Sequence, residues 1–168
     1  MGQNTKFTVH GTKIPGKVER RKEIAQICMM HPNTFVAQTS CAMSNHFYKA
    51  IMAANEYDGP AVVSVYTTCQ PEHGVGDNMA MQQSKLAVDT RTFPVLIYDP
   101  RKGDKIAQRL SLQGNPSEKL DFFIEPKTNE VYDFIRFART EGRFAKHFDK
   151  DGNPSETLLK AKQERLEN

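Results

Sequence analysis

The chain has 168 residues, 38% hydrophobic and 26% charged, and its 10 Phe and 5 Tyr supply material for a core. This length fits one domain that buries roughly two thirds of its unfolded surface, and the composition excludes disorder throughout. A net charge of +3 is too small to indicate a nucleic-acid partner. No run approaches the roughly 20 apolar residues of a membrane span, and no apolar signal core is visible at the N-terminus. We therefore expect a cytoplasmic protein without a membrane partner.

The first hundred residues alternate between predicted helices and predicted strands. We expect helices at 17–30, 45–55 and 77–88, and strands at 34–39, 61–66 and 93–98. The run at 61–66 is almost continuously apolar, which is typical of a strand buried on both faces of a parallel sheet. Strands and helices that alternate at this spacing predict an α/β fold with parallel crossovers.

The pattern changes after Pro100. Residues 101–129 are polar and predict a long connection, and residues 128–148 predict a helix that Gly142 interrupts. A capping residue and a proline at Asn153 and Pro154 predict the start of a last helix. We expect an α/β unit at 1–100, and at 101–168 a connecting segment with C-terminal helices that pack on it.

The cysteine count limits the possible chemistry. Cys28, Cys41 and Cys69 are an odd number without a CxxC pair, so a disulfide framework is not expected. Cys28 lies on the apolar face of the first predicted helix, which favours core packing. Cys41 follows a predicted strand and is also expected to pack in the core or a loop.

Cys69 is the most informative residue, because it follows the carboxyl end of the most apolar strand, where open α/β sheets bind ligands. Glu72 and His73 follow it within the same loop. The residues alone leave three interpretations open: a packed thiol, a metal ligand, or a reactive thiol with His73 as its base. Packing is the simplest of the three.

Other candidate sites are weaker. The remaining histidines show no metal-ligand spacing, and the glycines at 74 and 76 lack the rest of a phosphate loop, so a plain loop is expected there. The remaining histidines are His10, His31, His46 and His147. Asp149 and Asp151 lack the glutamate that would complete a calcium loop.

Four segments, 34–40, 53–61, 66–74 and 93–100, together and in this order resemble one family. They are similar to the C-terminal part of the pyruvate:ferredoxin (flavodoxin) oxidoreductases, namely the second half of the thiamine diphosphate domain. These enzymes are members of the 2-oxoacid:ferredoxin oxidoreductase superfamily. The resemblance is clear from residue 2 to residue 100 and looser toward the C-terminus. It implies a partial doubly wound parallel sheet with a helical C-terminal extension.

The resemblance also implies a reaction and a set of cofactors. The family converts a 2-oxoacid, here expected to be pyruvate, and coenzyme A (CoA) to acetyl-CoA and CO2, or runs the reverse. It uses thiamine diphosphate with Mg2+ and passes electrons through 4Fe-4S clusters to ferredoxin or flavodoxin. Cys69 matches the family cysteine that ligates the cluster nearest the thiamine. No catalytic residue is implied within this chain, and its cofactor-binding residues are unknown.

Departures from the family pattern matter equally. The Gly-Asp-Gly motif that holds the diphosphate and the other three cluster cysteines are absent from the sequence. His73 lies one residue further from the cysteine than in many members, so we assign it no role. We expect a component or fragment of the enzyme that needs its missing half as a partner, and that is inactive and without cofactor alone. The alternative is a non-catalytic α/β interaction module. In the first case, the sheet edge facing the missing half should be apolar and prone to association.

Overall fold

The computed structural model describes residues 2–3, 16, 19–116 and 121–167. Within these ranges, no helix combines the length and apolar character needed to cross a membrane.

A four-stranded sheet forms the centre of the first hundred residues and continues beyond them. Its strands are β1 (Phe35–Ser40), β2 (Ala61–Tyr66), β3 (Leu96–Tyr98) and β4 (Leu110–Ser111), in the order β2-β1-β3-β4. Every residue of β1 is buried. The strand that sequence alone singles out for burial on both faces, at 61–66, instead lies at the edge as β2.

The expected α/β class is confirmed, and the sheet is mixed rather than wholly parallel. β1 and β2 pair in parallel, with Phe35 opposite Ala61, and helix α2 (Ser44–Asn55) connects them. β3 runs antiparallel to β1, with Ala37 opposite Ile97, so the prediction of a third parallel strand is wrong. β4 is again antiparallel to β3.

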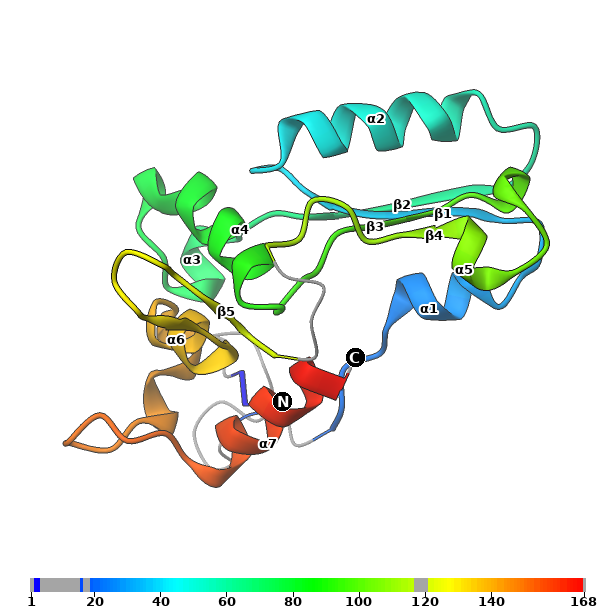
Figure 1. Cartoon of the computed structure of the whole chain (residues 1–168). Helices are drawn as coiled ribbons and strands as arrows, with labels where there is room; N and C mark the ends of the chain where they lie inside the picture. Colours follow the sequence, from blue (N-terminus) through cyan, green and yellow to red (C-terminus); the bar gives the residue numbers. More distant parts are fainter. Residues whose placement is uncertain (1, 4–15, 17–18, 117–120, 168) are drawn as a thin grey trace.

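The direction of β3 follows from the path of the chain after β2. Helices α3 (Gln70–His73), η1 (Asp77–Met79) and α4 (Ala80–Asp89) lie beyond the sheet end where β1 and β2 finish (Figure 1). The hydroxyl of Ser40, at the end of β1, donates to the carbonyl of Ser84 in α4 at 3.0 Å. Because α4 packs at this end of the sheet and does not return along one of its faces, β3 starts at the same end and runs antiparallel to β1.

Two helices cover opposite faces of the sheet (Figure 1). Against α2, the side chains of Phe35 and Ala37 pack on Ala50. On the other face, α1 (Ile24–Met29) places Ala25 against Val36 and strand β3. Successive side chains of β1 point to opposite faces, so Val36 meets α1 while Phe35 and Ala37 meet α2. For this reason β1 is buried on both sides.

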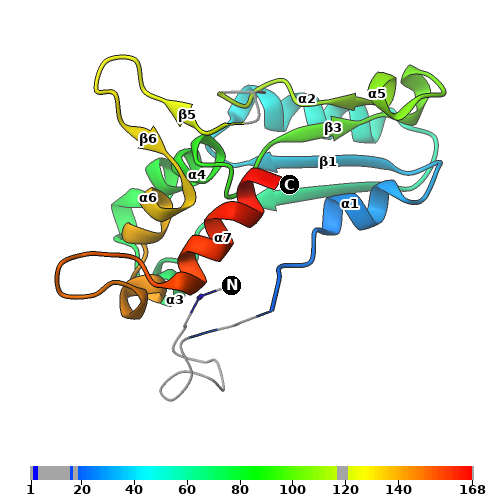
Figure 2. The ribbon, with the colours of Figure 1, turned by 60° about the horizontal axis from the view of Figure 1, so that its bottom comes forward.

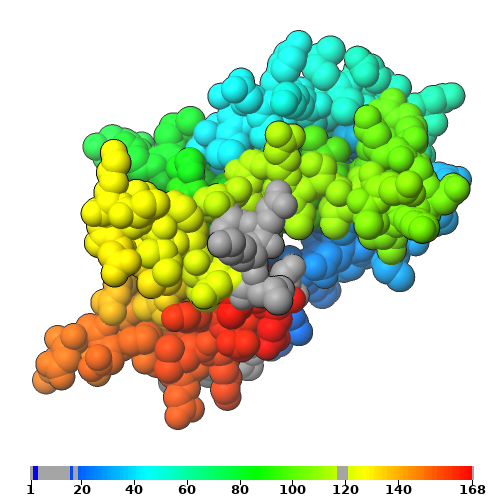
Figure 3. Space-filling model, in the orientation of Figure 1, coloured from blue at the N-terminus to red at the C-terminus, as the bar shows by residue number. Residues whose placement is uncertain are grey.

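The C-terminal region builds a second core beside the sheet. It contains α6 (Phe134–Arg139), η3 (Gly142–His147) and α7 (Glu156–Glu167), which pack with Ala87 of α4. The buried side chains of this core include Phe134, Phe137, Phe144 and Leu158. In Figure 2, α7 runs obliquely beside the end of the sheet, next to α6. Figure 3 shows α2 on one side of the molecule and the C-terminal segments on the opposite side. The expected helical extension is confirmed.

Several expected elements are shorter or more broken than predicted. The helix expected at 17–30 is confined to α1, although residues 17 and 18 lie outside the described ranges. The connection at 101–129 contains η2 (Pro100–Lys102), α5 (Ile106–Arg109), β4 and β5 (Phe123–Ile124). β5 pairs with β6 (Val131–Tyr132), which removes the first residues of the helix expected at 128–148. The division at residue 100 stays a prediction.

Candidate functional site

Cys69 is exposed at the carboxyl end of β2, where it precedes helix α3. Its carbonyl accepts a hydrogen bond from the amide of His73 at 2.8 Å, which closes the single turn of α3. Gly74 ends that turn with φ +63°, a left-handed conformation that glycine adopts without strain. The thiol is thus presented on a short loop with defined ends.

The other thiols pack as predicted. Cys28 lies partly buried beside Ala25 and Val36, and the Cys41 thiol donates to the hydroxyl of Ser84 at 3.1 Å. No three His, Cys, Asp or Glu side chains within the described ranges come together as a metal site. His10 lies outside those ranges.

The other polar candidates have structural partners. The Nδ1 atoms of His46 and His147 lie 3.0 Å from the Thr39 hydroxyl and 2.7 Å from the Ser155 hydroxyl. Asp149 accepts hydrogen bonds from backbone amides of the turn before α7, including that of Asp151 at 3.0 Å.

The contacts of His73 do not suit a general base for the Cys69 thiol. Its Nε2 atom accepts a hydrogen bond from the Arg143 guanidinium at 3.1 Å. Burial and the charge of Arg143 lower the pKa of His73 to about 4. Such a ring is a poor acceptor for a thiol proton at neutral pH, so the geometry disfavours the reactive-thiol interpretation.

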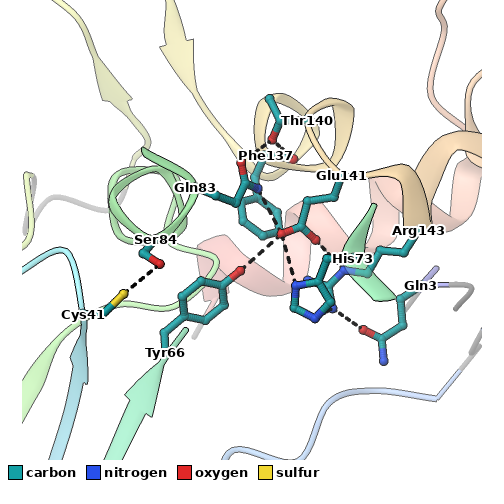
Figure 4. Close-up of polar contacts among 10 residues, drawn as sticks. All are labelled: Gln3, Cys41, Tyr66, His73, Gln83, Ser84, Phe137, Thr140, Glu141 and Arg143. Carbon is teal, nitrogen blue, oxygen red and sulfur yellow. Dashed lines mark hydrogen bonds and ion pairs between the residues drawn. The ribbon is translucent and has the colours of Figure 1, made fainter. Parts of the chain in front are cut away.

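A buried carboxylate, Glu141, lies beside Tyr66 and His73, the residues on either side of the Cys69 loop (Figure 4). Its side chain is 0% exposed, and it accepts hydrogen bonds from Tyr66 at 3.3 Å and Gln83 at 3.0 Å. The Arg143 guanidinium pairs with its second oxygen. Burial raises the pKa of Glu141, while its hydrogen-bond donors and Arg143 favour the ionised form. The same burial, with the neighbouring Glu141 charge, raises the pKa of Tyr66.

Sequence reasoning missed Glu141, Gln83 and Arg143. They fall within stretches that predict ordinary amphipathic helices, where a polar residue is expected to face water. Only their position among the aromatic residues of 134–144 distinguishes Glu141 and Arg143, and that pattern does not identify a partner 58 or 70 residues away.

Two buried side-chain oxygens in the Cys69 loop, Thr68 Oγ1 and Glu72 Oε1, have no hydrogen-bond partner, and His73 Nδ1 makes no hydrogen bond but lies 3.7 Å from Glu141 Oε1. His147 Nε2 is the only other side-chain atom of this kind in the described part of the chain. Buried polar groups are normally paired, so the oxygens of Thr68 and Glu72 set this loop apart from most of the described fold.

The described residues could supply only one ligand of an iron–sulfur centre. A 4Fe-4S cluster needs four ligands, and the described residues supply a single thiolate at this place, Cys69. The exposure of the Cys69 thiol leaves it open to a cluster whose other ligands lie outside this chain. The sequence lacks the Gly-Asp-Gly motif for the thiamine diphosphate, so the residues present do not form that site.

These features define an α/β domain with a cysteine-bearing loop at the carboxyl end of a strand. No family model matches the chain. It is 29% identical over 145 residues to the pyruvate synthase subunit PorB of Thermotoga maritima, a match that covers 86% of this chain and 39% of the relative. It is 29% identical to the pyruvate-flavodoxin oxidoreductase of Rhodospirillum rubrum, over 99% of this chain and 12% of the relative.

A third relative, the probable pyruvate-flavodoxin oxidoreductase of Escherichia coli, is 33% identical over 69% of this chain and 10% of its own length. The chain is therefore homologous to part of the 2-oxoacid:ferredoxin oxidoreductases, as the resemblance of the four segments implies. It spans between 10% and 39% of the length of these three relatives.

Proposed function

We propose that this chain is a component or part of a pyruvate:ferredoxin or pyruvate:flavodoxin oxidoreductase, the second half of its thiamine domain. The complete enzyme would convert pyruvate and CoA to acetyl-CoA and CO2, or run the reverse, in the cytoplasm. The similarity to three pyruvate oxidoreductases supports the family and the 2-oxoacid. Three free thiols agree with a reducing compartment.

Within that enzyme, we assign Cys69 the role of one ligand to the 4Fe-4S cluster nearest the thiamine. The observation that carries this assignment is the exposed thiol at the carboxyl end of β2, in a loop where the Thr68 and Glu72 side chains hold buried oxygens without hydrogen-bond partners. A cluster would relay electrons between the thiamine and the external carrier. The chain's own contribution is to present the thiolate on a short, closed turn.

The remaining ligands and the thiamine site would come from the missing half of the domain. Strand β2 is the place where that half would join, because it pairs only with β1 in the described part of the chain. The strand is apolar along most of its length, and Val65 is 40% exposed. An apolar edge with free backbone groups favours pairing with another strand.

A co-expression experiment tests the proposal. The chain is produced with the remaining part of the enzyme, which carries the Gly-Asp-Gly motif and the CxxC cysteines, and each is also produced alone. We expect the two to copurify and to show CoA-dependent reduction of a viologen dye by pyruvate, while neither is active alone. Failure to copurify, or the same activity without this chain, would contradict the proposal.

A further inference from the structure

The loop that carries Cys69 is tied at both of its ends to one turn in the C-terminal region (Figure 4). The loop runs from Tyr66, the last residue of β2, to Gly74, and the turn is the sequence Glu141-Gly142-Arg143. The two segments are 75 residues apart between Tyr66 and Glu141, so their contact is a property of the fold.

At the start of the loop, the phenol of Tyr66 donates to Glu141 Oε1 at 3.3 Å. The ring of Tyr66 also packs edge-on against Phe137, with a centroid distance of 6.5 Å. The end of β2 is therefore fixed to α6 and to the turn that follows it.

At the end of the loop there are two further contacts. Arg143 Nη1 donates to His73 Nε2 at 3.1 Å, and the amide of Gly142 donates to the carbonyl of Gly74 at 3.3 Å. The backbones approach so closely that a Cβ atom at Gly74 would lie 2.8 Å from the Gly142 Cα atom. A Cβ atom at Gly142 would lie 3.2 Å from the Gly74 Cα atom.

The turn also makes hydrogen bonds to α4 and to Gln3. Gln83 of α4 donates to Glu141 and accepts a hydrogen bond from Thr140 at 2.9 Å, and Arg143 also donates to Gln3 at 2.9 Å. Hydrogen bonds to charged groups contribute more to stability than neutral ones do. A buried carboxylate with several donors therefore makes a stiff anchor.

We propose that Glu141 and Arg143 are positioning residues that hold the Cys69 loop in the conformation from which its thiolate binds the cluster. This inference rests on the proposed ligand role of Cys69. The outer groups that orient a metal ligand govern binding and the properties of the metal nearly as much as the ligand does. Glu141 and Arg143 act here on the two ends of the loop, through the phenol of Tyr66 and the ring of His73, while the backbone of Gly142 holds Gly74.

The first test uses the full chain alone and needs no cofactor. Hydrogen exchange is measured for the peptide that contains the amides of His73 and Val75, which bond within α3. The variants are Arg143→Met and Gly142→Ala, with Arg136→Met as control, because Arg136 lies in an exposed ion pair with Glu130. We expect exchange in this peptide to become about tenfold faster or more in both variants. Arg143→Met loses a charged hydrogen bond, and in Gly142→Ala the added Cβ atom pushes the Gly74 backbone away from the turn. The control should be unchanged.

Gly142→Ala keeps every charge and hydrogen-bonding side chain, so it remains informative if Arg143→Met fails to fold. Wild-type exchange rates in folded Gly142→Ala and Arg143→Met would overturn the inference.

The second test uses the assembled complex and compares the electron paramagnetic resonance spectrum and reduction potential of its clusters. We expect Arg143→Met to alter one cluster's signal while Arg143→Lys restores it in part, because lysine keeps the charge but not the fork of donors. An unaltered signal would contradict the positioning role while leaving the ligand role intact. If Cys69→Ser retains full iron content, the proposed ligand role itself fails, and the exchange measurement still decides whether the turn holds the loop.

Discussion

Arg143 donates a hydrogen bond to the ring of His73 at 3.1 Å, across 70 residues of sequence. The arginine thereby connects the C-terminal region to the helix that follows Cys69, and it pairs at the same time with Glu141. This contact makes the C-terminal residues part of the cysteine site instead of a separate extension.

Among the charged residues that the structure describes, we expect substitution of Glu141 to reduce the stability of the fold most. In Glu141→Ala, Tyr66, Gln83 and Arg143 would lose their shared acceptor in a buried place, so we expect a loss of about 3–5 kcal/mol in the free energy of unfolding. Urea unfolding followed by circular dichroism measures it. Glu130→Ala breaks an exposed ion pair, which solvent screens, and should reduce the free energy of unfolding far less. An equal loss in the free energy of unfolding for Glu141→Ala and Glu130→Ala would contradict the prediction that Glu141 stabilises the fold through its buried contacts.

Gly74 should not tolerate a side chain. Its φ of +63°, and the 2.8 Å that would separate an alanine Cβ atom there from the Gly142 Cα atom, predict that Gly74→Ala destabilises the fold by about 1–3 kcal/mol. Gly76→Ala is the matched control, because a Cβ atom there meets only side-chain atoms of the residues that follow. Thermal unfolding of both variants checks this, and similar midpoints would argue against the close backbone contact.

His73 should make stability depend on pH. Its pKa is about 4 in the folded chain and near 6.5 when unfolded, so the unfolded state binds the extra proton between these values. The contribution of His73 to the free energy of unfolding is therefore fully present above pH 6.5, and it is lost as the pH falls toward 4.

Glu141 and Glu72 also face this ring and contribute their own pH dependence, so a variant is needed to isolate His73. Between pH 7 and pH 5, the unfolding midpoint should fall less in His73→Gln than in the wild type. An equal fall in both proteins would show that the low pKa of His73 does not contribute.

The β2 edge should drive association. We expect the isolated chain to form concentration-dependent oligomers, and Val65→Lys to reduce them, because a charge on an edge strand opposes strand pairing. Val131→Lys, at an exposed valine of the other sheet, is the control. Light scattering coupled to size-exclusion chromatography measures the mass. A wild-type chain that stays monomeric at all concentrations would count against the edge as an interface.

The sequence predicts the local elements that have a strong period or clear end signals. The strands that became β1 and β2, the helix between them and the proline-marked start of the last helix are all found close to their expected positions. The packing of Cys28 was also predictable, because its face of α1 was apolar.

Sequence patterns could not predict the contacts between residues that are far apart in the sequence. The direction of β3 depends on where α4 packs, and the hydrogen bond from Ser40 to Ser84 that holds α4 there has no local signal. The exposed edge position of β2 was missed because apolar composition does not distinguish a central strand from an edge awaiting a partner. The Glu141 network was missed because its donors come from three separated segments.

The iron content of the complex formed with the rest of the enzyme tests the central claim most directly. Wild type, Cys69→Ser, Cys28→Ser and Cys41→Ser are purified anaerobically with the partner and compared for iron and visible absorbance. We expect only Cys69→Ser to lose one cluster, about four iron atoms per complex. Unchanged iron and absorbance in Cys69→Ser would contradict it.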